Sequence, residues 1–182
     1  SVIADVDADT EVDGYVFANL TTEQDAVFGN SADNIFQAGL SADADTFQSG
    51  DYVNGGAGSD TLNVTLANSP FAITAETDSV ETLIVRSQAD GVAQGDNSAG
   101  SGQGVNTIDA QNMSGMNAFW STDSRADLVI EDVRNNSHET KIGWQNADAG
   151  DVDYKVYFDD TNITAPDANT GGSQLFLEIL DL

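Results

Sequence analysis

The sequence predicts an all-β fold, either a β-solenoid of the β-roll or β-helix kind or a β-sandwich, built from short strands and tight turns. Candidate strands are rich in β-branched and aromatic residues, and several alternate apolar and polar residues with the period of two that half-buried strands show. Gly, Asn, Asp and Ser separate these strands, and the 182 residues include only two prolines. No stretch keeps a 3.6-residue apolar stripe over three turns, so long helices are not expected.

Seven segments carry the strand pattern most clearly. They are residues 14–20, 61–66, 81–85, 127–133, 140–144, 153–158 and 174–180. In segment 153–158, Lys155 and Tyr157 would share one face of the strand, and Tyr154, Val156 and Phe158 the other. Residues 111–119 are expected to form a short helical turn at most.

Composition narrows the classes of partner. The chain has 31 acidic and five basic residues, giving a formal net charge of −26. Nucleic acid and anionic membrane surfaces require Lys and Arg, so neither is an expected partner. Cysteine is absent, which excludes disulfides, thiol catalysis and Cys-ligated zinc. Hydrophobic residues make up 40% of the chain, enough for a core, but the charge opposes compaction unless cations bind or the surface is adapted to high salt.

Targeting signals are not evident. No apolar run approaches the roughly 18 residues that a membrane span needs, and no basic-then-apolar signal peptide opens the chain, so membrane insertion is not expected. The chain begins at Ser1 rather than Met and ends in an apolar run. We therefore expect it to be a segment of a longer protein.

The most informative motif lies at residues 55–63. The run Gly-Gly-Ala-Gly-Ser-Asp-Thr-Leu-Asn fits the nine-residue pattern G-G-x-G-x-D-x-U-x at every fixed position, U being a large apolar residue. Nine residues before Asp60 stands Asp51, again in a D-x-U triplet, and eighteen residues before Asp51 stands Asp33 in another, preceded by Gly29.

The spacing of this motif predicts a calcium site. In a parallel β-roll the six residues G-G-x-G-x-D form a turn and x-U-x a brief strand whose apolar side chain enters the core. Glycines allow positive φ angles that aim carbonyls at one point, and the Asp adds a charged oxygen for a hard cation such as Ca²⁺. With two windings of nine residues per coil, Asp33 would face Asp51, and Asp60 would face Asp78. The candidate metal-binding residues are Asp33, Asp51, Gly55, Gly56, Gly58, Asp60 and Asp78, at one or two Ca²⁺ sites.

Residues 17–85 resemble the calcium-binding part of RTX-type (repeats-in-toxin) bacterial surface-layer and related secreted proteins. The similarity rests on segments 20–22, 25–29, 33–36 and 51–62, followed by a strand of the form apolar-Glu-Thr-Leu-x-Val at residues 80–85. This resemblance implies export without a cleaved N-terminal signal, an extracellular location, bound calcium, and a β-solenoid or β-sandwich body.

The domain organisation follows from these features. We expect an RTX-like calcium-binding β region over residues 1–90 and a loop over 91–104, which contains five glycines. A strand-rich region over 105–182 then continues the same solenoid or sheet. No catalytic residue is predicted, because the sole histidine, His138, lies in a polar turn and acid pairs are inevitable among so many acids.

The expected function is that of a non-enzymatic structural module in a large secreted or cell-surface bacterial protein of the surface-layer kind. Its expected partners are calcium ions and either copies of itself in a surface lattice or a cell-surface glycan. Two alternatives remain open. One is an adhesin or glycan-binding domain, which an exposed aromatic patch around Trp120 or Trp144 would favour. The other is an accessory domain of a secreted polysaccharide-active enzyme.

Overall fold

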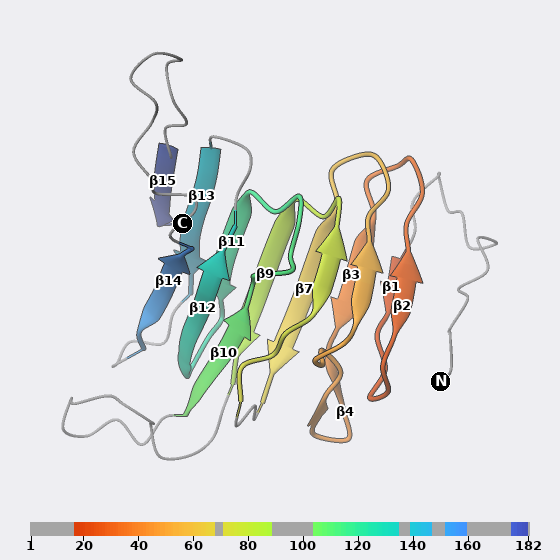
Figure 1. Cartoon of the computed structure of the whole chain (residues 1–182). Coiled ribbons are helices and arrows are strands. Elements are labelled where there is room, and N and C mark those ends of the chain that lie inside the picture. Colours follow the sequence, from red (N-terminus) through yellow and green to blue (C-terminus); the bar gives the residue numbers. More distant parts are fainter. Residues whose placement is uncertain are drawn as a thin grey trace, which may run out of the picture.

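The computed structural model describes residues 17–67, 71–88, 104–134, 139–146, 152–159 and 176–181. Within these ranges the chain forms fifteen strands and no helix. The strands stack in parallel as a β-solenoid of about five turns (Figure 1). The predicted all-β solenoid is confirmed, and its parallel pairing distinguishes it from an antiparallel sandwich.

One side of the solenoid is a parallel sheet of seven strands. In spatial order these are β1 (Phe17–Asn19), β3 (Ile35–Ala38), β7 (Thr61–Leu66), β9 (Thr82–Ser87), β11 (Ala118–Thr122), β13 (Glu139–Gln145) and β15 (Phe176–Asp181). Strand β9 pairs with β11, so the two regions separated by the glycine-rich segment share this sheet. Residues 91–103 of that segment lie outside the described residues.

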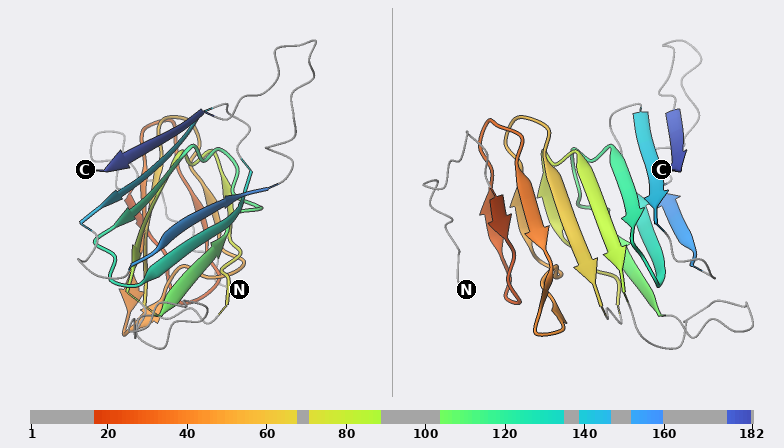
Figure 2. Two further views of the ribbon diagram at one scale, coloured as in Figure 1. Left: turned by 90° about the vertical axis from the view of Figure 1, so that its left-hand side faces the viewer. Right: turned by 180° about the vertical axis from the view of Figure 1, so that it is seen from behind.

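The opposite side consists of two three-stranded parallel sheets. The first contains β2 (Ala26–Phe28), β6 (Tyr52–Asn54) and β8 (Glu76–Asp78), and the second contains β10 (Val105–Asp109), β12 (Asp127–Val133) and β14 (Tyr154–Phe158). Two isolated bridges, Ile73 with Ile108 and Thr77 with Met113, connect them. The view along the solenoid in Figure 2 shows the two sides as facing layers.

The core is a column of apolar side chains, one from each coil, at matching register positions. In the seven-stranded sheet, Phe36 lies opposite Leu62, Leu62 opposite Leu83, and Leu83 opposite Phe119. All four are fully or almost fully buried, and Val53 of the facing layer is buried with them. Burying each such side chain contributes about 1.5–3 kcal/mol. The inward column thus fixes the register of successive strands, because a one-residue slip would expose every member.

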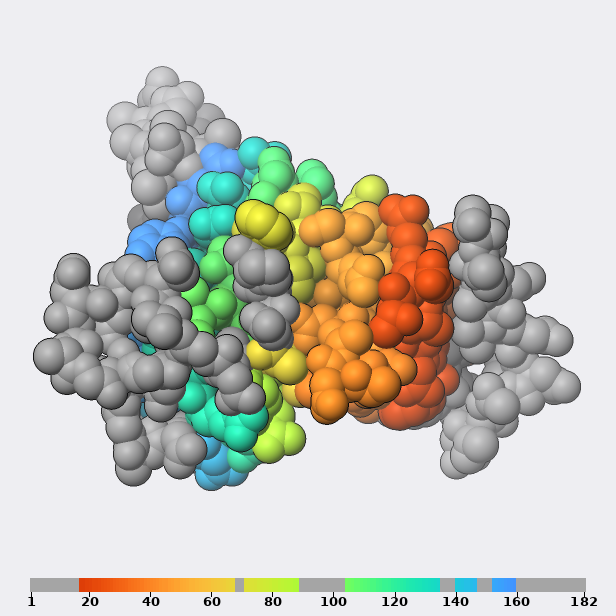
Figure 3. Space-filling model, turned by 90° about the horizontal axis from the view of Figure 1, so that it is seen from below, coloured from red at the N-terminus to blue at the C-terminus, as the bar shows by residue number. Residues whose placement is uncertain are grey.

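Successive coils follow one another in sequence order along the solenoid. Figure 3 shows this as a regular succession of colours from β1 towards the C-terminal strands. Each coil therefore makes most of its contacts with its two neighbours, as in other repeat architectures.

A hairpin interrupts the regular winding. Strands β4 (Leu40–Ser41) and β5 (Ala44–Asp45) pair antiparallel, and the loop they form projects from the stack (Figure 1). The two residues between them have positive φ, 50° at Ala42 and 67° at Asp43, as a two-residue type I′ turn requires. Strand β3 follows β1 by 18 residues, but β7 follows β3 by 26. The segment containing the hairpin therefore lengthens this coil by eight residues.

Each of the seven predicted strand segments contains a strand where it is described, and two have the predicted bounds, 61–66 and 127–133. Strand β6 follows from the D-x-U triplet at Asp51. Strand β3 follows in the same way from the triplet at Asp33. The predicted helical turn at 111–119 is wrong, because residues 111–117 form an irregular turn and 118–122 form β11. Strands β2, β8, β10, β11 and the hairpin were not predicted. No helix among the described residues is long and apolar enough to cross a membrane.

The two tryptophans do not form a joint aromatic patch. Trp120 lies opposite Gly143 on neighbouring strands, whereas Trp144 lies opposite the buried Ser121. Because adjacent residues of a strand face opposite sides, the two indoles lie on opposite faces of the sheet. A Cβ atom on Gly143 would lie 2.3 Å from the Trp120 ring, so the glycine makes room for this indole.

Candidate metal centre

Two turns of equal length stack on one another at one edge of the solenoid. Residues 29–34 join β2 to β3, and residues 55–60 join β6 to β7. The strands on both sides pair with an offset of 26 residues, so the turns align residue by residue. The Ala57 N–H donates to the Asn30 carbonyl over 3.0 Å, and the Ser59 N–H donates to Asp33 Oδ1 over 2.7 Å. The nonapeptide motif therefore forms the turn-then-strand unit that its pattern predicts.

The glycines of the motif have two different roles. Gly56 and Gly58 adopt φ angles of 91° and 125°, which confirms the prediction that they supply positive φ. Gly55 does not, but it is needed for close approach. A Cβ atom on it would lie 1.9 Å from the Ser79 carbonyl oxygen and 2.5 Å from Asp60 Oδ2.

A buried cluster of oxygens surrounds the side chain of Asn34. Its Nδ2 donates to the Ala32 carbonyl over 2.6 Å, to the Gly55 carbonyl over 3.0 Å and to Asp60 Oδ1 over 2.7 Å. The Asn34 backbone N–H also donates to Asp60 Oδ1, over 2.6 Å. Both Asn34 and Asp60 are completely buried. The Asn34 amide group thus holds together oxygens from two successive coils.

One oxygen of this cluster has no partner. Asp60 Oδ2 is buried and accepts no hydrogen bond from the residues that the structure describes. A buried carboxylate oxygen without a donor is costly, and a cation is one way to satisfy it. If the Asn34 amide turns over, its oxygen faces the carbonyls of Ala32 and Gly55, and the set becomes all oxygen, which suits a hard cation such as Ca²⁺.

The carboxylate content of this set is low. Among the described residues, no group of three or more His, Cys, Asp or Glu side chains lies close enough together to hold a metal ion. A cation here would depend on a single carboxylate, Asp60, with an amide and backbone carbonyls completing its protein ligands. The residues fit Ca²⁺ chemically, with less charge than a pair of aspartates would supply.

The predicted facing of Asp33 with Asp51 is wrong. It assumed coils of 18 residues, whereas the hairpin segment makes this coil 26 residues long. Asp33 instead lies beside Ser59 in the turn stack, and Asp51 lies beside Asp25 at the opposite edge, directly before β6. Asp51 is therefore separate from the Asp60 cluster.

The predicted facing of Asp60 with Asp78 is also wrong. The turn on that side has only three residues, 79–81, so Asp78 pairs with Asn54 at the end of β8. The neighbour of Asp60 is Glu81, whose Oε2 accepts the Asp60 N–H over 2.7 Å. Of the seven candidate residues, the structure brings only Gly55 and Asp60 into the cluster, while Gly56 and Gly58 shape the turn.

Asn34 is the residue that sequence reasoning missed. The motif requires Asp at this position, so the triplet was aligned on Asp33, one residue too early. In the structure Asn34 corresponds to Asp60, and Phe36 corresponds to the apolar Leu62. The signal in the sequence was Gly29, because the first glycine of the motif precedes its Asp by five residues, as Gly55 precedes Asp60, and five residues after Gly29 stands Asn34. The apolar position two residues later fits both alignments, since Ile35 and Phe36 are both apolar.

Asp51 is a buried carboxylate with a structural role. Its Oδ1 accepts the Asp25 N–H over 3.0 Å, and its Oδ2 accepts the Gln48 N–H over 2.7 Å. Burial raises the pKa of Asp51 to about 6, and the Asp25 carboxylate acts in the same direction, while the two backbone donors oppose the rise. The carboxylate thus joins the residue before β2 to the turn that leads into β6, and these two bonds favour its ionised form while burial opposes it.

The raised pKa of Asp51 predicts a pH dependence. Between pH of about 4 and about 6 the folded chain keeps a proton that the unfolded chain has released. The proton on Asp51 therefore stabilises the folded chain fully below pH 4. This stabilisation, roughly 3 kcal/mol, is lost as pH rises through 6. Urea unfolding at several pH values should show this slope in the native chain and a smaller slope in Asp51→Asn. The exposed-residue control, Asp43→Asn, should keep the native slope, and equal slopes in both variants would contradict the assignment.

We compared the chain with models of protein families, with curated proteins and with solved structures, and none of the three comparisons found a match.

Proposed function

We propose that this chain is a non-enzymatic structural module of a large secreted or cell-surface bacterial protein of the surface-layer kind, and that Ca²⁺ bound at the stacked turns stabilises it. The observation that carries the proposal is the buried Asp60 carboxylate, one oxygen of which has no partner among the described residues, inside a glycine turn stacked on the turn of the preceding coil. The resemblance of residues 17–85 to RTX-type proteins supports the same function.

The residues of this site couple ion binding to folding. Asp60 and the Gly55 carbonyl come from one coil, and Asn34 and the Ala32 carbonyl come from the coil before it. These oxygens are close together only when the two coils are stacked. Bound Ca²⁺ supplies positive charge that offsets the buried carboxylate. A ligand that binds only the folded state stabilises it by about 2.7 kcal/mol at a hundredfold excess over its Kd.

An extracellular location is consistent with the charge of the molecule. With a net charge of −26, the folded chain opposes its own compaction. Divalent cations reduce that repulsion, and extracellular calcium modules typically bind in the range of 10⁻⁴–10⁻³ M. In a calcium-poor cytoplasm the chain would remain less stable and suited to export, and it would become more stable outside the cell.

Thermal unfolding with Ca²⁺, Mg²⁺ and chelator tests this proposal. We expect millimolar Ca²⁺ to raise the Tm by about 5–10 °C over chelator, as a linkage of this size predicts for a chain of this length. Mg²⁺ should have a much smaller effect, because it requires near-ideal octahedral geometry and dehydrates reluctantly. Identical melting curves in Ca²⁺ and in chelator would refute the calcium part of the proposal.

Asn34→Asp sharpens this test. It places a second carboxylate in the buried cluster, so we expect a Tm below that of the native chain in chelator and a larger gain on adding Ca²⁺. Asn30→Asp is the matched control. It adds the same charge to the same turn, where Asn30 Oδ1 accepts the Ala32 N–H over 2.8 Å, outside the Asn34 cluster. If Ca²⁺ raises the Tm of the two variants by equal amounts, it acts by general screening of charge and does not bind at a specific site.

A further inference from the structure

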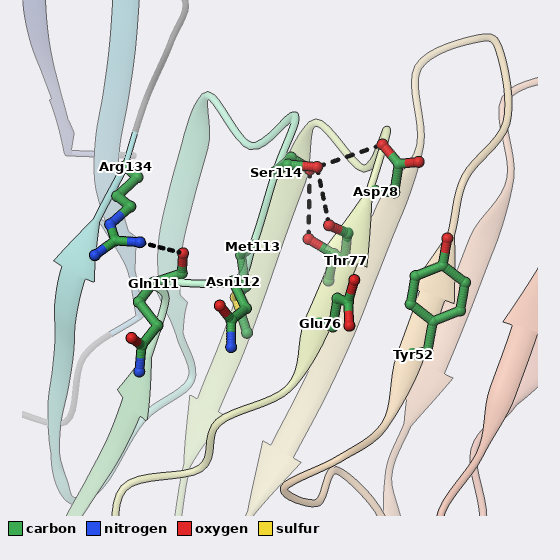
Figure 4. Close-up of a pocket in the computed structure, with 9 residues that line it drawn as sticks. All are labelled: Tyr52, Glu76, Thr77, Asp78, Gln111, Asn112, Met113, Ser114 and Arg134. Atoms are coloured by element: carbon green, nitrogen blue, oxygen red, sulfur yellow. Dashed lines mark hydrogen bonds between the residues drawn. The ribbon is translucent and has the colours of Figure 1, made fainter.

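A polar pocket of about 440 Å³ opens on the outer face of the solenoid, and one of its lining residues, Asp78, lies next to the turn stack, where its carbonyl accepts the Gly55 N–H over 2.9 Å. It lies where the sheet of β8 gives way to the sheet of β10, which are joined only by isolated bridges in the described structure. Residues of β6, of β8, of the turn 111–114 and Arg134 after β12 line it. Figure 4 shows them in a row across the strands, with Tyr52 and Arg134 at opposite ends. Three strand spacings separate those ends, roughly 14 Å.

One end of the pocket is aromatic. The Tyr52 ring packs edge-on against Phe28, with ring centroids 5.7 Å apart and planes at 63°. Phe28 is 58% exposed. The Tyr52 hydroxyl accepts a hydrogen bond from Asn54 Nδ2 over 3.0 Å, which fixes the ring on the face of the sheet. Together these rings present an apolar surface to solvent beside a polar pocket.

The middle of the pocket holds hydrogen-bonding groups that are available to a ligand. Neither the Glu76 carboxylate nor the Asn112 side-chain amide bonds to another residue in the described parts of the chain. Asp78 is held in place, since its carboxylate accepts from Ser114 Oγ and from Asn54 Nδ2, each over 3.3 Å. At the far end, Arg134 Nε donates to Asp159 over 2.6 Å. Asp78 and Arg134 are thus held in place by hydrogen bonds. The Glu76 carboxylate and the Asn112 amide, at the centre of the pocket, remain available to a ligand.

We propose that this pocket binds a neutral saccharide chain lying along the solenoid axis, from Tyr52 towards Arg134. The aromatic rings would pack against the apolar C–H face of a sugar ring, while Glu76 accepts from hydroxyl groups and Asn112 both donates and accepts. The net charge of −26 disfavours acidic polysaccharides, nucleotides and phosphates. An open pocket with polar walls is also unsuited to a purely apolar ligand. This site is independent of the calcium proposal.

Titration with a panel of neutral hexasaccharides tests the pocket. We would use cellohexaose, chitohexaose, maltohexaose and mannohexaose, with isothermal calorimetry on the full chain in Ca²⁺. We expect at least one to bind with a Kd of millimolar or tighter, and Tyr52→Ala to weaken that binding at least tenfold. Tyr157→Ala is the matched control, because Tyr157 is 55% exposed on β14 and does not line the pocket. Its Kd should equal that of the native chain.

Two further variants separate binding from folding. Tyr52→Phe keeps the ring and loses the hydroxyl, so it should retain binding within about threefold, and Glu76→Gln should weaken binding without lowering the Tm. The proposal is overturned if no neutral hexasaccharide binds at millimolar concentration. It is equally overturned if Tyr52→Ala and Tyr157→Ala behave alike, or if Tyr52→Phe, still folded by circular dichroism, loses binding as completely as Tyr52→Ala.

Discussion

Replacing Asp60 by alanine should lower the free energy of unfolding by about 2–4 kcal/mol. The substitution removes the oxygen that accepts both the backbone N–H and the side-chain Nδ2 of Asn34. Both donors are fully buried, and each loses a hydrogen bond to a charged group, which contributes about 1.5–3 kcal/mol, although Nδ2 keeps the Ala32 and Gly55 carbonyls as acceptors. Urea unfolding in chelator measures this loss without any contribution from calcium. The same variant should also lose most of the Tm gain that Ca²⁺ gives the native chain.

Asp33→Ala is the appropriate comparison for Asp60→Ala. Asp33 belongs to the same pair of turns, but its carboxylate accepts the Ser59 N–H in an exposed environment. Solvent can replace that bond, so we expect a loss below about 1 kcal/mol and an undiminished calcium response. Similar losses in both variants would mean that the buried cluster has no special importance.

The second large effect should come from Gly55→Ala. The added Cβ would lie 1.9 Å from the Ser79 carbonyl oxygen, a backbone atom, and 2.5 Å from Asp60 Oδ2. The first neighbour is a backbone atom, and the Asp60 side chain is buried and held by its hydrogen bonds to Asn34, so the coils must move apart. Overpacking of this kind costs about 1–3 kcal/mol, and here it also strains the hydrogen bonds of Asp60. We expect a loss of about 3 kcal/mol in urea unfolding and a weaker calcium response.

Gly39→Ala provides the control for this prediction. A Cβ atom on Gly39 would have no heavy atom within 4 Å outside its chain neighbours. Neither Gly39 nor Gly55 has a positive φ, so the pair differs in available space and not in backbone conformation. We expect Gly39→Ala to be neutral or slightly stabilising, since alanine lowers the entropy of the unfolded chain. A loss at Gly39 equal to that at Gly55 would contradict the steric explanation.

From the sequence, the glycine turn at residues 55–60 and the strand after it could be predicted, but the turns that stack on it could not. The glycine turn, β7 and the inward position of Leu62 all follow from nine consecutive residues and their torsional preferences. Which turn stacks on which depends on the length of the intervening chain, and the hairpin changed that length. As a result Asp33 and Asp51 were paired wrongly, and Asn34, the true counterpart of Asp60, was overlooked.

The short strands were hard to predict for a related reason. Strands β2 and β8 have three residues each, too few for an alternating pattern to stand out from chance. They are strands because neighbouring coils supply their hydrogen bonds, which is tertiary information. The saccharide pocket depends on the same information, since Tyr52, Glu76 and Asn112 come together only through the stacking of coils.

The hairpin at residues 40–45 also shows that a coil can become longer while its strands keep their register with those of the next coil. Eight residues enter at one edge of the molecule, yet β3 and β7 still pair in parallel and Phe36 still lies opposite Leu62. Insertions at such an edge can therefore accumulate during evolution without compensating changes in the interior. For protein engineering, the tip between Ala42 and Asp43 is accordingly a natural place to graft and display a foreign peptide.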